Sequence, residues 1–161
     1  MHESNRVLRI LNSYYSMLDM SSDLEKEFEE YWTDRIPGLL EYSRIILNSN
    51  TDLSFILNIF LKDKGQCKII DMGTGVGTLA IELALMGHEV HAMDNNPKMI
   101  DAARELANEF GVEVRFIEGD ILDPDIPEQK YDVVVARNCL WNLTEPSKAY
   151  TSWKKLLKPG G

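Results

Sequence analysis

Short apolar runs and helical patterns alternate along the second part of the chain. Four runs have the length and residue types of β-strands, and they cover residues 67–71, 89–94, 112–117 and 133–136. Apolar residues return at the helical period in the segments between and after them, over residues 78–86, 97–110 and 145–157. Strands that alternate with helices predict an α/β fold with a parallel sheet and helices on both faces.

The first part of the chain carries helical patterns alone. Apolar residues recur at spacings of three and four in the segments 7–17, 24–32, 39–47 and 53–61, with a Pro-Gly pair before the third. We therefore predict that residues 1–60 form an N-terminal helical lid or cap segment. Residues 61–161 are predicted to form the sheet domain.

Composition and charge limit the classes of protein that fit. With 161 residues, 44% of them hydrophobic, the chain is long enough for one domain with a core. A formal net charge of −9 argues against nucleic acid as a partner, because such binding depends on clustered lysine and arginine. Cys67 and Cys139 make no disulfide framework or metal-binding pattern, so we expect no metal and a reducing cytoplasm. Signal-peptide and membrane-span patterns are absent, so a soluble, intracellular protein is expected.

A glycine-rich turn follows the first predicted strand and is typical of a ligand-binding loop. Gly73, Gly75 and Gly77 occupy every second position, and Thr78 opens the next helix. Glycine permits positive φ and close approach of a ligand, and a helix N-terminus offers unpaired N–H groups. The dinucleotide spacing G-x-G-x-x-G is broken at its sixth position by Thr78. Asp71, which closes the strand, would repel a pyrophosphate and accept hydrogen bonds from an ammonium group, so a cationic ligand fits better.

The acidic residue followed by G-x-G-x-G resembles the first motif of the class I S-adenosylmethionine-dependent methyltransferases. The resemblance covers about residues 31–161 and is to the small-molecule, UbiE-like (type 11) members. It implies a Rossmann-like, doubly wound parallel sheet with strand order 3-2-1-4. It also implies S-adenosylmethionine as the cofactor, S-adenosylhomocysteine as the product and a small molecule as the methyl acceptor.

The resemblance implies a role for residues along the whole sheet domain. By this resemblance, Asp71 with Gly73 and Gly75 would contact the amino-acid end of the cofactor, and Asp94 would contact the ribose hydroxyls. Asn95 and Met99 would contact the edge of the nucleoside, and Asp120 with the Ile121 backbone would contact the adenine amino group. Arg137 would contact the methionine part. Asp94 also lies near the offset at which dinucleotide folds place an acid on ribose hydroxyls. Taken singly, Asp94 is also a candidate helix cap, and Asp120 a candidate turn residue.

Four residues are candidates to contact the acceptor: Tyr31, Trp32, Asn138 and Trp141. The first two resemble the aromatic N-terminal segment that folds over the cofactor in this family, although an ordinary helix face also explains Trp32. Asn138 follows the fourth strand, where ligands bind in open α/β sheets, or is a turn residue. Trp141 packs in its loop or forms a wall of the acceptor pocket.

Three functions remain open from the sequence. The first is a methyltransferase, in which the sulfonium already carries an activated methyl group and a catalytic base is optional. His88 and His91 have no neighbouring Asp or Cys arrangement and are interpreted as structural. The second is an NAD(P)-dependent oxidoreductase, disfavoured by Asp71 and Thr78. The third is a cofactor-binding domain without catalysis.

The end of the chain predicts an open sheet. Residues 158–161, Lys-Pro-Gly-Gly, resemble the turn that leads into the fifth strand of the family, so we expect the C-terminal strands to be missing. The fourth strand would then form an edge with three valines, a composition prone to pairing with another chain. A fragment of a longer protein, a homodimer through that edge, or helices folded over it would each explain the pattern.

Overall fold

The computed structural model of the chain describes residues 21–49 and 52–161. The chain forms two compact units, Met1–Arg35 and Ile36–Gly161. In the first unit the structure describes α2 (Ser21–Thr33) and the turn after it, which confirms the helix predicted over residues 24–32. The helix predicted over residues 7–17 lies outside the described residues.

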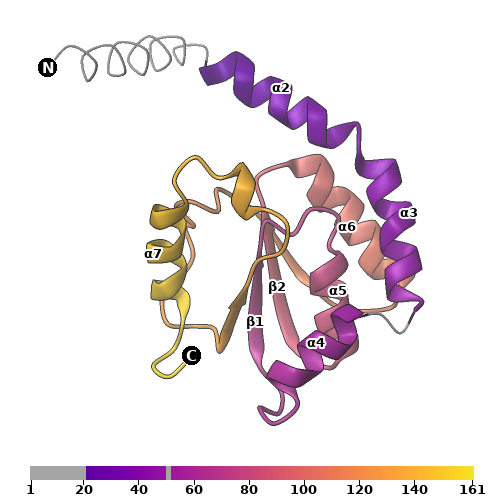
Figure 1. Cartoon of the computed structure of the whole chain (residues 1–161), viewed down its shortest axis with the longest axis vertical. Coiled ribbons are helices and arrows are strands. Elements are labelled where there is room, and N and C mark those ends of the chain that lie inside the picture. The colour runs from indigo at the N-terminus through magenta and orange to yellow at the C-terminus, as the bar shows by residue number, and fades with distance from the viewer. Residues whose placement is uncertain (1–20, 50–51) are drawn as a thin grey trace, which may run out of the picture. The chain divides into compact units, whose positions relative to one another are not determined.

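The second unit contains a four-stranded sheet in which neighbouring strands run parallel (Figure 1). Its strands are β1 (Lys68–Met72), β2 (Glu89–Asp94), β3 (Arg115–Glu118) and β4 (Val133–Val135). They follow the predicted order, β3-β2-β1-β4. Asp71 pairs in register with Ala92 of β2 and with Val135 of β4, so it lies near the carboxyl end of a central strand.

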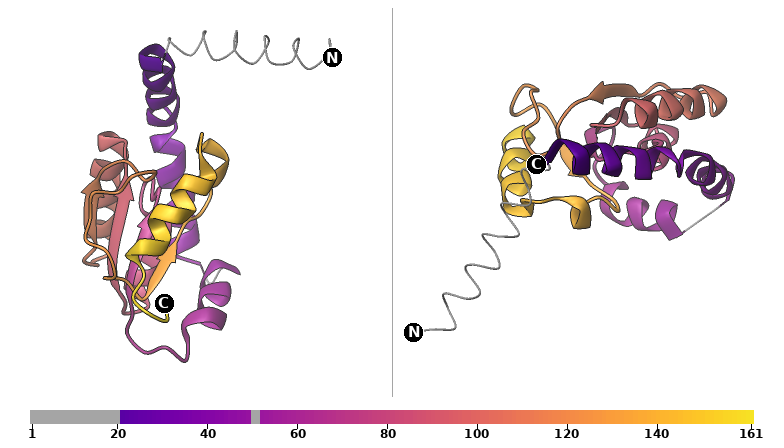
Figure 2. Two further views of the ribbon diagram at one scale, coloured as in Figure 1. Left: turned by 90° about the vertical axis from the view of Figure 1, so that its left-hand side faces the viewer. Right: turned by 90° about the horizontal axis from the view of Figure 1, so that it is seen from above.

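Helices cover both faces of this sheet (Figure 2). The helices of this unit are α3 (Ile36–Leu47), α4 (Asp52–Leu61), α5 (Thr78–Leu85), α6 (Pro97–Glu109) and α7 (Pro146–Leu156), with the short 3-10 helix η2 (Leu140–Asn142) before the last. Ile69 of β1 packs in a core cluster with residues of α4 and α5, whereas Ile70 packs with residues of α7. Successive strand residues point to opposite faces, so the sheet is doubly wound, as predicted.

In the sheet unit, two helix or strand starts differ from the prediction by three residues. α3 begins at Ile36 rather than at Leu39, because a proline is tolerated in the first turn of a helix, where its missing N–H has no partner. β3 begins at Arg115 rather than at Val112. The N–H of Val112 instead donates to the carbonyl of Ala107 and closes the end of α6. The first residue of the third apolar run, Val112, therefore belongs to the C-terminal end of α6 rather than to the strand.

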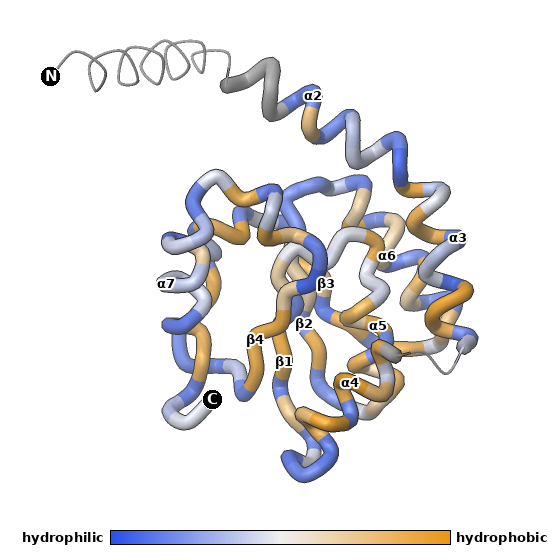
Figure 3. The backbone as a smooth tube through the Cα atoms, viewed as in Figure 1, coloured by the Kyte–Doolittle hydropathy of each residue, from blue (hydrophilic) through white to orange (hydrophobic). Residues whose placement is uncertain are grey.

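Hydrophobic residues are concentrated in β1, β4 and α4 (Figure 3). The valines of β4, at one edge of the described sheet, are half-buried. The homodimer through this edge stays a prediction. The outer side of α4 is also apolar, with exposed Phe55, Ile56, Ile59 and Phe60. Among the described residues, no helix combines the length and the apolar character that a membrane span needs.

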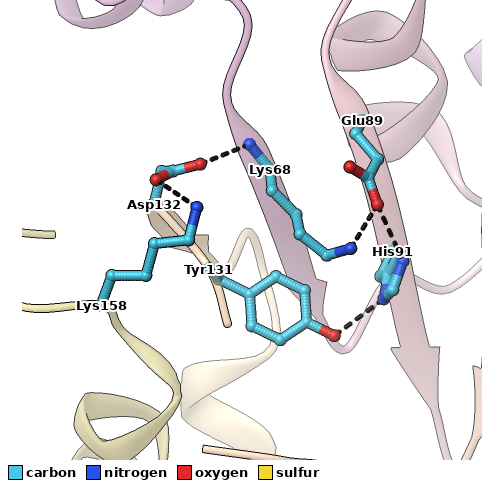
Figure 4. A network of polar contacts seen from close by, with 6 residues as sticks. All are labelled: Lys68, Glu89, His91, Tyr131, Asp132 and Lys158. Carbon is cyan, nitrogen blue, oxygen red and sulfur yellow. Dashed lines mark hydrogen bonds and ion pairs between the residues drawn. The ribbon is translucent and has the colours of Figure 1, made fainter. Parts of the chain in front are cut away.

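Polar side chains near the amino ends of the strands are paired with one another (Figure 4). Asp132 accepts hydrogen bonds from the backbone N–H of Lys68 and from the ammonium group of Lys158, both at 2.7 Å. The hydroxyl of Tyr131 lies 2.8 Å from Nδ1 of His91. Burial lowers the pKa of His91, which favours the neutral imidazole. These contacts agree with a structural role for His91, away from the glycine turn.

Candidate cofactor-binding site

The glycine turn connects the carboxyl end of β1 to the N-terminus of α5. Its three glycines all have positive φ, 72° at Gly73, 57° at Gly75 and 83° at Gly77. The N–H groups of Gly73 and Thr74 both donate to the carbonyl of Met93 in β2, at 2.9 Å. The turn is thereby fixed to the neighbouring strand and takes a conformation that favours glycine.

The three glycines meet different surroundings. A methyl carbon added at Gly73 would lie 2.7 Å from Cβ of Cys139, and one added at Gly77 would lie 3.0 Å from Cβ of Ala103 in α6. At Gly75 the same carbon would meet no atom within 4 Å. Gly73 and Gly77 therefore allow the chain to pack, whereas Gly75 leaves space in which a ligand can approach the backbone.

The carboxyl group of Asp71 is buried, and one of its oxygens has no hydrogen-bond partner in the described residues. Its side chain is 1% exposed, and Oδ2 accepts a hydrogen bond from the Thr74 hydroxyl at 2.7 Å. Oδ1 is buried and has no hydrogen-bond partner among the described residues. Burial raises the pKa of Asp71 from 3.8 to about 7, and the nearby charge of Asp94 adds to this rise. The hydrogen bond from Thr74 and the charge of Arg137 act in the opposite direction. A buried carboxyl with a free oxygen is suited to pairing with a cationic ligand.

Asp94 connects the glycine turn to the start of α6. Its Oδ2 accepts the N–H of Gly75 at 2.8 Å, and its Oδ1 accepts the N–H of Asn96 at 3.0 Å. Burial raises the pKa of Asp94, and these backbone hydrogen bonds oppose the rise. Each carboxylate oxygen can accept a second hydrogen bond, so both retain capacity for a hydroxyl donor. Beyond it, Asn95 is exposed, and Met99 is buried in the first turn of α6.

The loop after β3 lies against the same site. The N–H of Gly119 donates to the carbonyl of Asp94 at 3.0 Å. Cδ1 of Ile121 would lie 3.4 Å from a methyl carbon added at Gly73. Asp120 is exposed, and its Oδ1 accepts the N–H of Leu122 at 2.8 Å. The carboxyl ends of β1, β2 and β3 thus bring together residues that the sequence named separately.

The loop after β4 contacts the glycine turn through Cys139. The thiol of Cys139 donates to the carbonyl of Met72 at 3.2 Å. Burial, with the charges of Asp71 and Asp94, raises the pKa of this thiol to about 11, so it is protonated and is a poor nucleophile. Sequence reasoning missed this packing role, since nothing in the pattern connects a cysteine after the fourth strand with a glycine after the first.

The remaining candidates of this loop differ in exposure. Arg137 is half-buried and close enough to lower the pKa of Asp71. Asn138 is exposed and has φ of 59°, a left-handed conformation that asparagine tolerates. Trp141 in η2 is 69% exposed. Arg137 is the only charged residue of the three, and its charge favours the ionised form of the buried carboxyl.

Thr78 stands where a dinucleotide-binding loop carries its third glycine, and its side chain forms a hydrogen bond between two helices. Its hydroxyl lies 2.5 Å from the hydroxyl of Ser43 in α3, which itself donates to the carbonyl of Leu39 at 2.7 Å. With that donor committed, Thr78 donates to Ser43. Thr78 therefore fixes α3 to the start of α5.

The aromatic candidates of the N-terminal segment lie in α2, in the first unit. The rings of Tyr31 and Trp32 pack edge to face, with centroids 5.3 Å apart. The guanidinium of Arg35 lies 3.3 Å from the centre of the Tyr31 ring and donates to its carbonyl at 2.8 Å. Contact of Tyr31 or Trp32 with an acceptor stays a prediction. In the described residues no group of His, Cys, Asp and Glu is arranged to hold a metal ion.

The fold and this arrangement at the strand ends agree with comparisons to known proteins. The chain belongs to the methyltransferase domain family, whose sequence model matches residues 69–161. The fold is that of the class I S-adenosylmethionine-dependent methyltransferases, as the sequence indicated. A solved relative, an S-adenosylmethionine-dependent methyltransferase from Aquifex aeolicus, is 26% identical, with a TM-score of 0.68 over 79% of this chain and 68% of that chain.

Two curated relatives have different activities in their names. A demethylmenaquinone methyltransferase from Thermus thermophilus is 36% identical over 62% of this chain and 46% of its own length. A carboxy-S-adenosyl-L-methionine synthase from Nautilia profundicola is 37% identical over 81% of this chain and 55% of its own length. The chain therefore spans about half the length of the curated relatives it matches.

Proposed function

We propose that this domain binds S-adenosylmethionine at the carboxyl ends of β1, β2 and β3 and serves methyl transfer to a small-molecule acceptor. The observation that carries the proposal is Oδ1 of Asp71, a buried oxygen without a hydrogen-bond partner in the described part of the chain. The ammonium group of the cofactor would pair with this carboxylate beside the space at Gly75. The pyrophosphate of NAD would instead bring negative charge toward it.

Each described part of the site has a proposed task. Asp71 and Gly75 hold the amino-acid end of the cofactor, while Gly73, predicted to share that task, lets the turn pack closely against Cys139. Asp94 holds the ribose hydroxyls, and Asn95 and Met99 hold the nucleoside edge. Asp120 and Ile121 hold the adenine, and Arg137 holds the methionine part. When bound, the cofactor supplies a methyl group that its sulfonium has already activated. The protein then needs to hold the acceptor in line and exclude water, so we assign no side chain as a catalytic base.

The names of the Nautilia and Aquifex relatives support S-adenosylmethionine as the cofactor, and the names of the relatives leave the acceptor open. The Thermus relative is named for demethylmenaquinone, and the Nautilia relative is named for a product that is itself a derivative of S-adenosylmethionine. Because different reactions are named for relatives of one domain, cofactor binding is the property we transfer to this chain. The acceptor is proposed only as a small molecule.

Calorimetry separates this proposal from its alternatives. We expect S-adenosylmethionine and S-adenosylhomocysteine to bind with one site per chain and NAD to give no heat of binding. NAD binding without S-adenosylhomocysteine binding would favour an oxidoreductase instead. Binding of S-adenosylmethionine without methyl transfer to any acceptor of a quinol and phenol panel would favour a cofactor-binding domain without catalysis.

The lid proposed for the N-terminal helices makes a separate prediction. The sheet unit, residues 36–161, has its own core clusters, whereas Phe28 and Tyr31 of α2 are exposed. Deleting residues 1–30 is therefore expected to lower methyl transfer more than it lowers the unfolding temperature. Turnover and thermal unfolding of the same preparation measure both effects. An unchanged rate and acceptor KM after the deletion would exclude the lid.

A further inference from the structure

The loop that follows β3 is held by a helix from the far end of the chain. Trp153 of α7 donates its indole N–H to the carbonyl of Ile121 at 2.6 Å. The neighbouring Ser152 donates its hydroxyl to the carbonyl of Leu122 at 3.0 Å. Two consecutive carbonyls are therefore bound by two consecutive side chains of one helix, which fixes both the position and the orientation of the loop.

Packing supports the same connection. Trp153 is 5% exposed and belongs to the core cluster against which Ile121 and Leu122 pack. The buried indole has its N–H satisfied by the loop, so loss of this bond would leave a buried donor without a partner. The loop conformation and the placement of α7 on the sheet therefore depend on each other.

With its carbonyls bound, the loop presents one acceptor and one donor. The carboxylate of Asp120 uses Oδ1 for the N–H of Leu122, which leaves Oδ2 available. The N–H of Ile121 donates no hydrogen bond within the described residues. Adenine offers an amino donor beside the ring acceptor N1, which matches this pair. Hypoxanthine offers a carbonyl beside an N–H, which opposes it at both positions.

We propose that Ser152 and Trp153 are positioning residues that set the adenine specificity of the site by holding the backbone at Ile121 and Leu122. This inference rests on the proposed function, because it assumes that the purine of the cofactor lies at Asp120. Ser152 and Trp153 bond the backbone of the loop. They act through the loop, so their effect is expected on the choice of base rather than on binding of the amino-acid end.

The test compares S-adenosylhomocysteine with its hypoxanthine analogue, in which a carbonyl replaces the 6-amino group. For the unchanged chain we expect the adenine form to bind at least about 10-fold more tightly than the hypoxanthine form. A mismatched pair of hydrogen-bonding groups in a desolvated site lowers the affinity by about this much. Trp153→Phe keeps an aromatic side chain, smaller than the indole, and removes the N–H, and Ser152→Ala removes the hydroxyl. Each variant is expected to reduce the adenine preference at least about threefold.

The neighbouring Thr151 provides a matched control. Its hydroxyl donates to the carbonyl of Ser147 at 2.8 Å, a bond that stays within α7. Thr151→Ala should therefore keep the full preference for adenine. Calorimetry gives both affinities, and thermal unfolding gives the stability of each variant. A purely structural role would lower stability and leave the ratio of the two affinities unchanged.

The outcomes are distinct. Loss of preference in Ser152→Ala and Trp153→Phe, with Thr151→Ala unaffected, supports the positioning role. An unchanged ratio in Ser152→Ala, or in a folded Trp153→Phe, overturns it while the proposed function stands. Failure of the unchanged chain to bind S-adenosylhomocysteine would contradict the proposed function itself, and the role of α7 with it.

Discussion

Replacing Asp71 with asparagine is expected to stabilise the ligand-free protein at pH 8 and to weaken its binding of S-adenosylhomocysteine. Oδ1 of Asp71 is buried without a hydrogen-bond partner in the described residues, so a charge there is costly. Asparagine removes that charge and retains an oxygen for the Thr74 hydroxyl. It also removes the partner proposed for the ammonium group, which should lower the affinity by about 10- to 100-fold.

The stability effect has a defined dependence on pH. The folded state raises the pKa of Asp71 from 3.8 to about 7, so the folded chain binds this proton more tightly than the unfolded chain does. The resulting stabilisation is complete below pH 3.8 and is lost as the pH rises to about 7. Three pKa units correspond to about 4 kcal/mol, and we expect Asp71→Asn to recover about half of it at pH 8, because its amide is also buried.

Thermal unfolding between pH 5 and pH 8 measures this difference. The unfolding temperature of Asp71→Asn should exceed that of the unchanged chain by about 5 °C at pH 8, and the gap should shrink toward pH 5. Asp125→Asn is the control, since it removes one negative charge from an exposed position. A variant that is less stable than the unchanged chain at pH 8 would mean that the carboxylate of Asp71 already has a partner.

The sheet was predictable from the sequence because its signals are local. The apolar run of β2 ends at a carboxylate, and the Asn-Pro pair that follows it caps α6, so both boundaries were found. The strand order came from the resemblance carried by the glycine turn. Where local signals compete, prediction failed, as at Val112, whose apolar side chain fits a strand but whose N–H closes a helix.

The division of tasks within the candidate site was not predictable. The sequence assigned Gly73 and Gly75 to the same purpose, the close approach of a ligand. The structure assigns Gly73 to contact with Cys139, a residue 66 positions away, and leaves space only at Gly75 among the three glycines of the turn. Such contacts depend on how distant loops meet, which neither periodicity nor spacing contains. The raised pKa of Asp71 likewise arises from burial by the whole fold.

Substitutions at the two glycines are expected to separate ligand binding from folding. Gly75→Ala places its methyl group in open space, so it should lower stability by only about 1 kcal/mol, the cost of a positive φ for alanine. The same methyl group occupies the space proposed for the cofactor. We expect the affinity for S-adenosylhomocysteine to fall by about 10-fold or more. An unchanged affinity in calorimetry would exclude Gly75 from the cofactor site.

Gly73→Ala, in contrast, should have its main effect on folding stability. Its methyl group would lie 2.7 Å from Cβ of Cys139, and the residue would also keep φ of 72°. Together these are expected to cost about 3 kcal/mol, measured by denaturant unfolding. Cys139→Ala cannot relieve the clash, because Cβ remains, whereas Cys139→Gly removes the contacting atom. A double variant with Cys139→Gly should therefore be less destabilised than the sum of its single changes, and strict additivity would show that the two loops do not meet at this contact.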